Sequence, residues 1–249
     1  MWCSRQGATP QSRQDLVGVS GSALHTAEAF GAALAGVDLR KTPIGLDAGA
    51  AGLAAAKALM AVVGDTGLAP GASLGLDPVS AIAAAGLSGE AVADWCAAAI
   101  GMPAGRGVFW MNAGSGTFYD SGASEAEELG CLLASGVAYL RGLEAAGLDV
   151  ATAAGRITFT LALGQDQFMT IAKARAARML WASVLRHAGA AEAAGVMRLD
   201  GVTAERMFAR HDPHVNVLRA TIAGFAGAVA GLDGLTVLPF DVRRGGVDP

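Results

Sequence analysis

Two histidines three residues apart form the strongest metal-binding pattern in the chain. His211 and His214 flank Asp212 and Pro213, and an i, i+3 pair on one helix face can hold a metal ion if a third ligand lies near. The same residues also fit the start of a helix, with Asp212 as N-cap, Pro213 in the first turn and an apolar segment from Val215. We favour the helix start and predict no metal site.

Local motifs for nucleotide binding and hydrolysis fail at specific positions. Gly114-Ser-Gly116 lacks the third glycine of a dinucleotide-binding loop, and the chain has no Gly-Lys-Ser/Thr phosphate loop. Gly18-Val-Ser20-Gly-Ser22 has a serine where a nucleophile elbow needs its second glycine. No local motif therefore assigns a catalytic residue.

Two groups of charged residues fall on predicted helices. An acidic group is expected to form the first turn of a helix, where the helix dipole favours it: Glu125, Glu127 and Glu128. A basic group is expected to make salt bridges within the chain or across a subunit interface, not a phosphate site: Lys173, Arg175 and Arg178.

Composition limits the class of protein and its partners. Of 249 residues, 53% are hydrophobic and 16% charged, and the net charge is -4, so we expect a folded domain without a nucleic-acid partner. The longest strongly apolar stretch free of charge, Ala220 to Leu232, has 13 residues, short of the roughly 20 that cross a bilayer, so no membrane association is expected. Cys3, Cys96 and Cys131 show no Cys-x-x-Cys spacing, which favours unpaired thiols and a cytoplasmic location.

The fold is predicted from an alternation of short apolar runs with Ala/Leu-rich helical segments. The runs are Leu16–Val19, Pro43–Asp47, Ala72–Asp77, Val108–Met111, Ile157–Leu163, Val196–Leu199 and Leu235–Leu238, with a weaker eighth near Trp2–Arg5. The clearest helices are predicted over Glu125–Ala145 and Gln165–Leu185. This number of units in this length favours an α/β fold of the (β/α)8 TIM-barrel class over an open doubly wound sheet. We expect one domain over residues 1–249, with an incomplete barrel because no closing helix follows Leu238.

Three stretches of sequence carry a family resemblance. They join Ser121–Leu129 with Gly136–Leu140, Arg156–Thr160 with Asp166–Trp181, and Arg210–Thr221 with Thr236–Asp241. Together they resemble the barrel domain of the methylmalonyl-CoA mutases, which are adenosylcobalamin-dependent isomerases. The resemblance is close over about residues 120–241 and looser over Pro43–Ala85.

The resemblance implies a binding site for an acyl-CoA ester. In the family the pantetheine chain runs along the barrel axis, and the protein shields radical chemistry of the cofactor from water. The expected substrate-binding residues are Arg156, Thr158, Gln165 and Gln167, from the start and the carboxyl end of one strand. Each also has a structural explanation: an arginine can cap a strand edge, a threonine favours a strand, and residues around Asp166 can cap a helix.

The family's catalytic positions are changed in this chain. In the pattern Gly-Tyr-His-Met-Gln-Glu-Ala-Gly-Ala, the tyrosine and histidine positions are Gly116 and Thr117. The pattern Arg-x-His-Cys-Gln-Thr-Ser reads Arg198–Ala204, which keeps the arginine and threonine but loses the histidine and glutamine. In Thr-Ile-Gln-Asn-Asp, read here as Ser73–Asp77, the glutamine is Gly75. We therefore predict no catalytic residue.

The chain most resembles the small, non-catalytic subunit of a heterodimeric mutase. The resemblance implies a catalytic large mutase subunit as partner, although a homodimer stays open, and a parent complex that interconverts methylmalonyl-CoA and succinyl-CoA. Adenosylcobalamin is expected in that complex and not on this chain alone, since no cobalamin-binding domain is present. The alternatives are an independent acyl-CoA-binding barrel enzyme that does not use cobalamin, and a remnant that does not fold. At 249 residues the chain is expected to be a fragment or a natural truncation.

Overall fold

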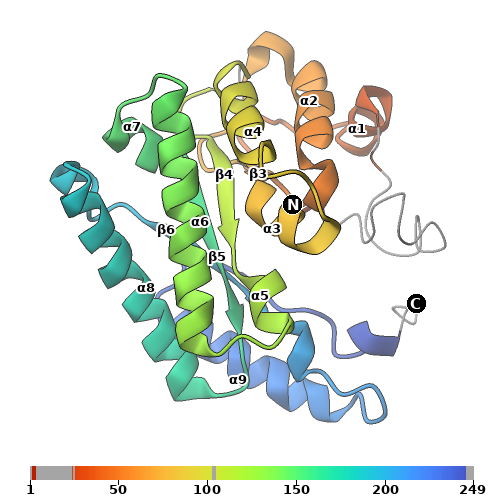
Figure 1. Cartoon of the computed structure of the whole chain (residues 1–249). Helices are drawn as coiled ribbons and strands as arrows, with labels where there is room; N and C mark the ends of the chain where they lie inside the picture. Colours follow the sequence, from red (N-terminus) through yellow and green to blue (C-terminus); the bar gives the residue numbers. More distant parts are fainter. Residues whose placement is uncertain (1, 4–23, 25, 103–104, 245–249) are drawn as a thin grey trace. The chain divides into compact units, whose positions relative to one another are not determined.

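The computed structural model describes residues 2–3, 24, 26–102 and 105–244, which form an α/β fold (Figure 1). The strands are β1 (Trp2–Cys3), β2 (Gly45–Leu46), β3 (Ser73–Leu76), β4 (Phe109–Gly114), β5 (Ile157–Leu163), β6 (Arg198–Thr203) and β7 (Gly234–Thr236). The α-helices are α1 (Ala27–Ala33), α2 (Gly52–Val63), α3 (Pro78–Ala85), α4 (Ala91–Ile100), α5 (Gly116–Asp120), α6 (Glu125–Ala145), α7 (Val150–Ala154), α8 (Gln167–His187) and α9 (Val215–Val229). Among these described helices, none is both long and apolar enough to span a membrane.

The chain divides into two compact units. The first comprises Met1–Asn112 and Ala138–Ile157, and the second comprises Ala113–Val137 and Thr158–Pro249. In the first unit, parallel strands follow one another in chain order from β1 to β4, with Gly45 beside Ser73. In the second, β5, β6 and β7 do the same. Parallel neighbours in chain order, joined by helical connections, define the (β/α)8 class, so the predicted fold class is confirmed in an incomplete form.

Most strand predictions are confirmed. The run Ile157–Leu163 is β5 to the residue, and the runs beginning at Pro43, Ala72, Val108 and Leu235 overlap β2, β3, β4 and β7. The weaker run near Trp2 contains β1, and Leu16–Val19 lies outside the described residues. The prediction Val196–Leu199 is wrong in its bounds because β6 continues through Asp200 and Gly201 to Thr203. These two turn-forming residues stay in the strand because tertiary packing buries them.

Helix predictions succeed where a cap is clear. The prediction Glu125–Ala145 matches α6, and α8 begins two residues after the predicted Gln165 because the Asp166 side chain caps it, accepting from Met169 N at 3.0 Å. The prediction that Asp212 caps α9 is wrong. His214 takes the N-cap position, without a side-chain capping bond, and Pro213 precedes the helix.

In the first unit, a tyrosine fixes the end of β3. The Tyr139 hydroxyl donates to Asp77 at 2.5 Å and accepts from Val79 N at 3.1 Å, and Asp77 also caps α3. Burial, reinforced by the neighbouring carboxylate, raises the pKa of Tyr139. Cys96 lies 3.9 Å from the Tyr139 carbonyl oxygen, and burial raises the pKa of this thiol to about 11. The Tyr139 phenol and the Cys96 thiol therefore keep their protons and bond to neighbouring groups, as expected of structural residues.

In the second unit, one face of the β5–β7 strands is packed against helices. The Phe159 ring of β5 meets the Trp181 ring of α8 edge-on, with centroids 4.7 Å apart. Gly136 of α6 lies directly over both rings, since a Cβ there would be 2.7 Å from Phe159 and 3.0 Å from Trp181. This contact sets how closely α6 approaches the strand.

We predict opposite effects for two glycine-to-alanine substitutions on α6. Gly130→Ala meets nothing within 4 Å and is expected to stabilise the protein by about 0.5–1 kcal/mol through helix propensity. Gly136→Ala is expected to destabilise it by about 1–3 kcal/mol because two core rings must shift. Thermal unfolding followed by circular dichroism checks both, and equal melting temperatures for the two variants would contradict the packing described.

Candidate functional site: the carboxyl ends of strands β4 to β6

The last two residues of β4 belong to the second unit, and there they end beside β5 and β6, at the edge where barrel enzymes place their active sites. Ser115 directly follows β4, and its backbone N–H donates to the Thr160 carbonyl of β5 at 3.0 Å. Tyr119 of α5 forms a buried cluster with Ala162 of β5 and Ala204, which follows β6. Any chemistry of this unit is expected among the polar groups of this edge.

A buried ion pair links two helices beneath this edge. Lys173 of α8 and Glu128 of α6 are 1% and 0% exposed, and the lysine also donates to the Ala162 carbonyl at 2.7 Å. The second carboxylate oxygen of Glu128 accepts from Ser115 Oγ at 2.6 Å and from Ala162 N at 3.0 Å. Desolvation lowers the pKa of Lys173, and the attraction of Glu128 opposes that shift. Both charges are thus satisfied within the protein.

The basic residues of α8 were predicted to make salt bridges. Lys173 does so with Glu128, and Arg178 pairs with Asp233 at 3.0 Å while donating to the carbonyls of Met197 and Gly231. These two assignments are confirmed. Glu128 does lie in the first turn of α6, as predicted. That its side chain is fully buried was not predicted.

Tyr119 lies at the same edge, but its ring is 5% exposed. Lys173 Nζ lies 4.2 Å from the ring centroid and the Arg206 guanidinium carbon 3.3 Å from it. The hydroxyl bonds to Glu125 at 3.2 Å, and burial raises the pKa of the phenol. The aromatic ring is therefore a packing element held by two cations and is not presented to a ligand.

The buried pair of Lys173 and Glu128 was not predicted from the sequence, although the sequence contained one sign of it. The buried positions of α8 include Thr170, Ala174, Ala177 and Trp181, and Lys173 lies among them. A lysine on an otherwise apolar helical stripe requires a buried acidic partner.

The other face of the strands carries polar side chains. Phe159 and Gly201 face the helices, so alternation places Thr160 and Asp200 on the opposite face, and register sets these two side by side. Arg198, two residues before Asp200, pairs with it at 3.4 Å.

Asp200 is the least satisfied polar group of this face. Its second oxygen, Oδ1, is buried and has no hydrogen-bond partner among the described residues. Burial raises the pKa of Asp200, and Arg198 partly offsets the shift. Gly234 lies directly beside it, since a Cβ there would be 2.6 Å from Oδ1 and would make the carboxylate shift.

The structure places Arg156 in the first unit, at the residue before β5. Its guanidinium donates to the carbonyls of Val108 at 2.9 Å and Gly105 at 3.3 Å, and lies 4.6 Å from the Trp110 ring centroid. Desolvation lowers its pKa. These contacts tie together backbone near the amino end of a strand, and the binding role of Arg156 stays a prediction.

The other three predicted binding residues belong to the second unit and do not form one cluster. Thr158 is 2% exposed near the start of β5, Gln165 is exposed in the loop after β5, and Gln167 is half-buried at the first residue of α8. At about 3.3 Å per residue, Thr158 lies roughly 16 Å before Leu163, the last residue of β5, and Gln165 follows in the loop. Only Gln165 and Gln167 lie at the carboxyl edge.

The backbone at Gly75, in the first unit, leaves no space for the glutamine that the catalytic pattern Thr-Ile-Gln-Asn-Asp has at this position. Gly75 has a φ of +59°, and a Cβ built on it would overlap the Leu46 carbonyl oxygen. In the second unit, Gly116 and Thr117 form the first turn of α5 and carry no imidazole or phenol.

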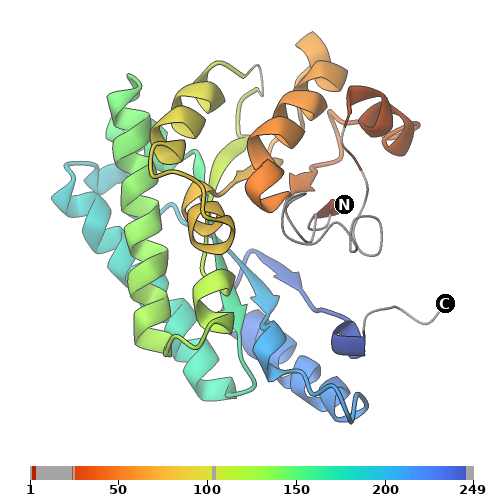
Figure 2. The same cartoon turned by 45° about the vertical axis from the view of Figure 1, so that its right-hand side comes forward.

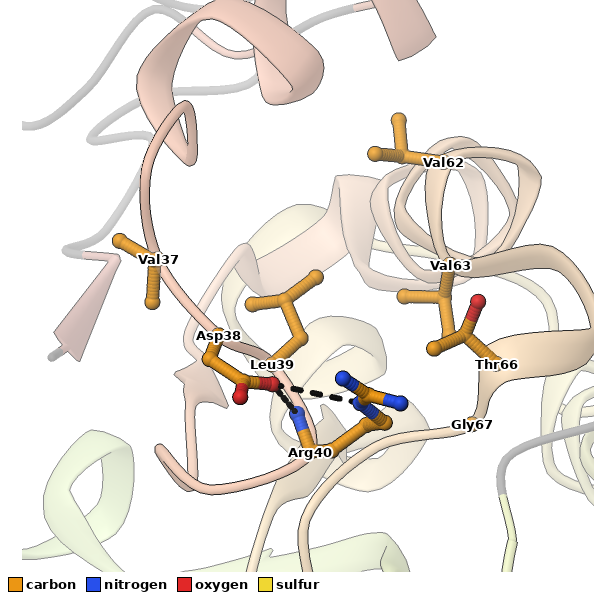
Figure 3. A pocket seen from close by; sticks show the side chains of 8 residues that line it. All are labelled: Val37, Asp38, Leu39, Arg40, Val62, Val63, Thr66 and Gly67. Carbon is orange, nitrogen blue, oxygen red and sulfur yellow. Dashed lines mark hydrogen bonds and ion pairs between the residues drawn. The ribbon is translucent and has the colours of Figure 1, made fainter.

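A pocket of about 330 Å³ opens in the first unit between the segment before β2 and the end of α2 (Figure 3). Its Asp38 carboxylate accepts from the backbone N and the Nε of Arg40, and Val62 and Val63 form the opposite wall. The pocket precedes β2 and β3, at their amino ends, where barrel folds place stabilising residues. Among the described residues, no group of three or more His, Cys, Asp or Glu side chains could hold a metal ion.

The barrel class agrees with the comparisons to known proteins. Residues 102–243, more than half of the chain, match the family model for methylmalonyl-CoA mutase. The chain is 41% identical over 219 residues to the methylmalonyl-CoA mutase small subunit of Streptomyces virginiae, covering 86% of this chain and 35% of that protein. It is 34% identical over 176 residues to the small subunit of Propionibacterium freudenreichii subsp. shermanii, covering 70% and 27%.

The chain belongs to the methylmalonyl-CoA mutase family, an isomerase family, as the sequence resemblance predicted. It is also 32% identical over 127 residues to the methylmalonyl-CoA mutase of Escherichia coli, covering 51% of this chain and 18% of that protein. The chain spans about a third of the length of the small subunits from Streptomyces virginiae and Mycobacterium bovis that it matches.

We predict that Lys173→Met destabilises the protein by about 3–5 kcal/mol, because it leaves Glu128 charged and buried. Adding Glu128→Gln should recover about 2 kcal/mol or more, since the amide still accepts from Ser115 and Ala162 without carrying charge. A double-mutant cycle in urea measures this coupling. Additive effects of the two substitutions would show that the pair is not coupled.

We predict that Asp200→Asn changes the pH dependence of stability. The folded pKa of Asp200 is raised above an unfolded value of about 3.9, so the native state loses stability as pH rises from there through the folded pKa. The asparagine variant lacks this loss and should be about 1 kcal/mol more stable than wild type at pH 7. Unfolding free energies from pH 4 to 7 check the slope, and a wild type that gains on the variant with rising pH would contradict it.

Proposed function

We propose that this chain is a non-catalytic, small-subunit-like member of a methylmalonyl-CoA mutase complex, in which it stabilises a catalytic large chain. The observation that carries the proposal is Gly75, whose backbone leaves no space for the glutamine that catalytic chains resembling this one carry. Gly116 and Thr117 support it, because neither offers the phenol or imidazole that the catalytic pattern has at these positions. The interconversion of methylmalonyl-CoA and succinyl-CoA then belongs to the parent complex.

Adenosylcobalamin is proposed to act in that complex and to be held by another polypeptide. The residues described do not fit the cofactor: His214, the nearest candidate for an axial ligand, begins α9 and its ring stacks on Phe240 at 5.8 Å. The position three residues later is Val217, where cobalamin-binding motifs have glycine. We therefore assign no part of the cofactor's chemistry to this chain.

The proposed location of the protein is the cytoplasm, because its cysteines show no pattern of paired thiols.

Residual binding of an acyl-CoA ester is a second proposal. In the second unit, contacts to both Thr158 and Gln165 require a ligand extended over at least about 16 Å along β5, which suits a pantetheine chain better than a compact metabolite. Gln167 would add an amide contact near the carboxyl end of β5. Arg156 belongs to the first unit, and for it we propose a separate contact to a phosphate or thioester oxygen. Isothermal calorimetry with methylmalonyl-CoA tests this, with Thr158→Val as the variant expected to weaken any binding.

The function is tested by assaying the purified chain with adenosylcobalamin and methylmalonyl-CoA. We expect no succinyl-CoA above a protein-free blank, because the acyl-binding side chains are absent. Co-expression with a catalytic mutase chain should give a co-purifying complex whose large chain melts at a higher temperature than alone. Turnover by the lone chain would contradict the proposal and favour the independent enzyme, and a non-cooperative melt would favour the remnant.

A further inference from the structure

One carboxylate oxygen is enclosed between the last two strands of the second unit, which lie side by side (Figure 2). Asp200 of β6 is 7% exposed, and its Oδ1 has no hydrogen-bond partner among the described residues. The register sets Asp200 opposite Gly234, the first residue of β7. A Cβ on Gly234 would lie 2.6 Å from Oδ1 and 3.1 Å from the carboxyl carbon, so the carboxyl group lies directly against β7. An ionised oxygen in this place is neither hydrated nor hydrogen-bonded, which is unfavourable.

The charges around Asp200 leave this oxygen without a partner. Arg198, on the same strand, pairs with the other carboxylate oxygen, Oδ2, at 3.4 Å. Arg178 of α8 pairs with Asp233, the residue before β7, and the neighbouring strand β5 places the uncharged Thr160 beside Asp200. Burial raises the pKa of Asp200, the attraction of Arg198 opposes that shift, and the charge of Asp233 adds to it. The neutral acid is therefore the form that suits this seam between the strands.

Strand β7 is short and is held at its two ends. The Asp233 carboxylate accepts from Leu199 N at 2.8 Å, and Asp233 N donates to the Leu199 carbonyl at 2.9 Å. Beyond the strand, Leu238 N donates to Thr203 Oγ1 at 2.8 Å. Between these anchors Gly234–Thr236 pairs with β6 alone among the described strands. An edge strand of three residues can separate locally while its anchors stay bonded, because local openings need less free energy than global unfolding.

Opening of β7 would let water reach the Asp200 carboxyl group. In the open state the pKa returns to the ordinary value of about 3.9, whereas in the closed state it is raised. The closed strand thus binds the proton more tightly than the open strand, so proton binding favours closure. Closure is most stable below pH of about 3.9, weakens as the pH rises through the folded pKa, and changes no further above it.

We propose that β7 is a proton-controlled edge strand: the neutral Asp200 acid keeps Gly234–Thr236 paired with β6, and ionisation raises the fraction of molecules in which this segment is open. Opening also withdraws Leu235 from α9, where a Cβ on Gly227 would lie 3.0 Å from its side chain. The proposal does not depend on the mutase function, because it uses only contacts within the second unit.

Hydrogen–deuterium exchange of the full chain from pH 4 to 7, corrected for the intrinsic exchange rate at each pH, tests the proposal. The Gly234–Thr236 amides should exchange through an opening at least about tenfold more frequent than global unfolding. In the wild type, its equilibrium constant should rise by up to about tenfold per pH unit above pH 4 and then level off. Asp200→Asn should remove this rise, because the amide does not ionise.

A matched control and a second variant separate the proton of Asp200 from other effects. Asp166→Asn changes an exposed carboxylate of the same unit and should leave the β7 opening constant within about twofold of the wild type at every pH. Arg198→Gln should extend the rise to higher pH, because the attraction of Arg198 lowers the pKa of Asp200.

Three outcomes would overturn the proposal. The first is a β7 opening constant that does not change with pH in the wild type, a measurement that needs no variant to fold. The second is exchange of the Gly234–Thr236 amides at the rate of global unfolding, which would show that β7 does not open locally. The third is a pH dependence that persists in a folded Asp200→Asn protein, which would assign the proton to another group.

Discussion

The buried pair Lys173–Glu128 is the interaction on which the second unit depends. One lysine and one carboxylate, both nearly inaccessible to water, connect α8, α6, the turn after β4 and the backbone of β5. Burying two charges is costly unless every donor and acceptor is used. Because the strand carbonyl, the strand N–H and the serine hydroxyl complete the pair, the carboxyl ends of β4 and β5 are held in one arrangement.

This constraint explains how the fold of the second unit can be kept in the non-catalytic chain that we propose. The polar groups at the carboxyl edge contact one another. The Tyr119 ring lies between the cations of Lys173 and Arg206, and the Ser115 hydroxyl donates a hydrogen bond to the Glu128 carboxylate. At the positions that the family resemblance assigns to catalysis, this unit carries Gly116, Thr117 and Asp200, whose Oδ1 has no hydrogen-bond partner among the described residues. Apart from Asp200, these polar groups are satisfied within the protein and need no ligand, which is consistent with the supporting role that we propose.

The sequence predicted features that depend on local rules. The amphipathic pattern and acidic first turn placed α6 correctly, and Asp166 was recognised as a cap of α8, although that helix begins two residues after the predicted start. Family membership followed from distinctive stretches. The interior of β6 and the start of α9 were mistaken, because Asp200-Gly201 and Asp212-Pro213 carry turn and cap propensities that tertiary packing overrides. The Lys173 cluster could not be assigned, since its partners are 11 to 58 residues away in the sequence.

The most direct test of this account is a nuclear magnetic resonance measurement on Glu128 and Lys173 in the full chain. We predict that the carboxyl ¹³C shift of Glu128 and the Nζ shift of Lys173 stay unchanged when methylmalonyl-CoA and adenosylcobalamin are added together, because the pair is a closed structural unit. A change in either shift at saturating ligand would show that the edge takes part in substrate chemistry, and would contradict the account.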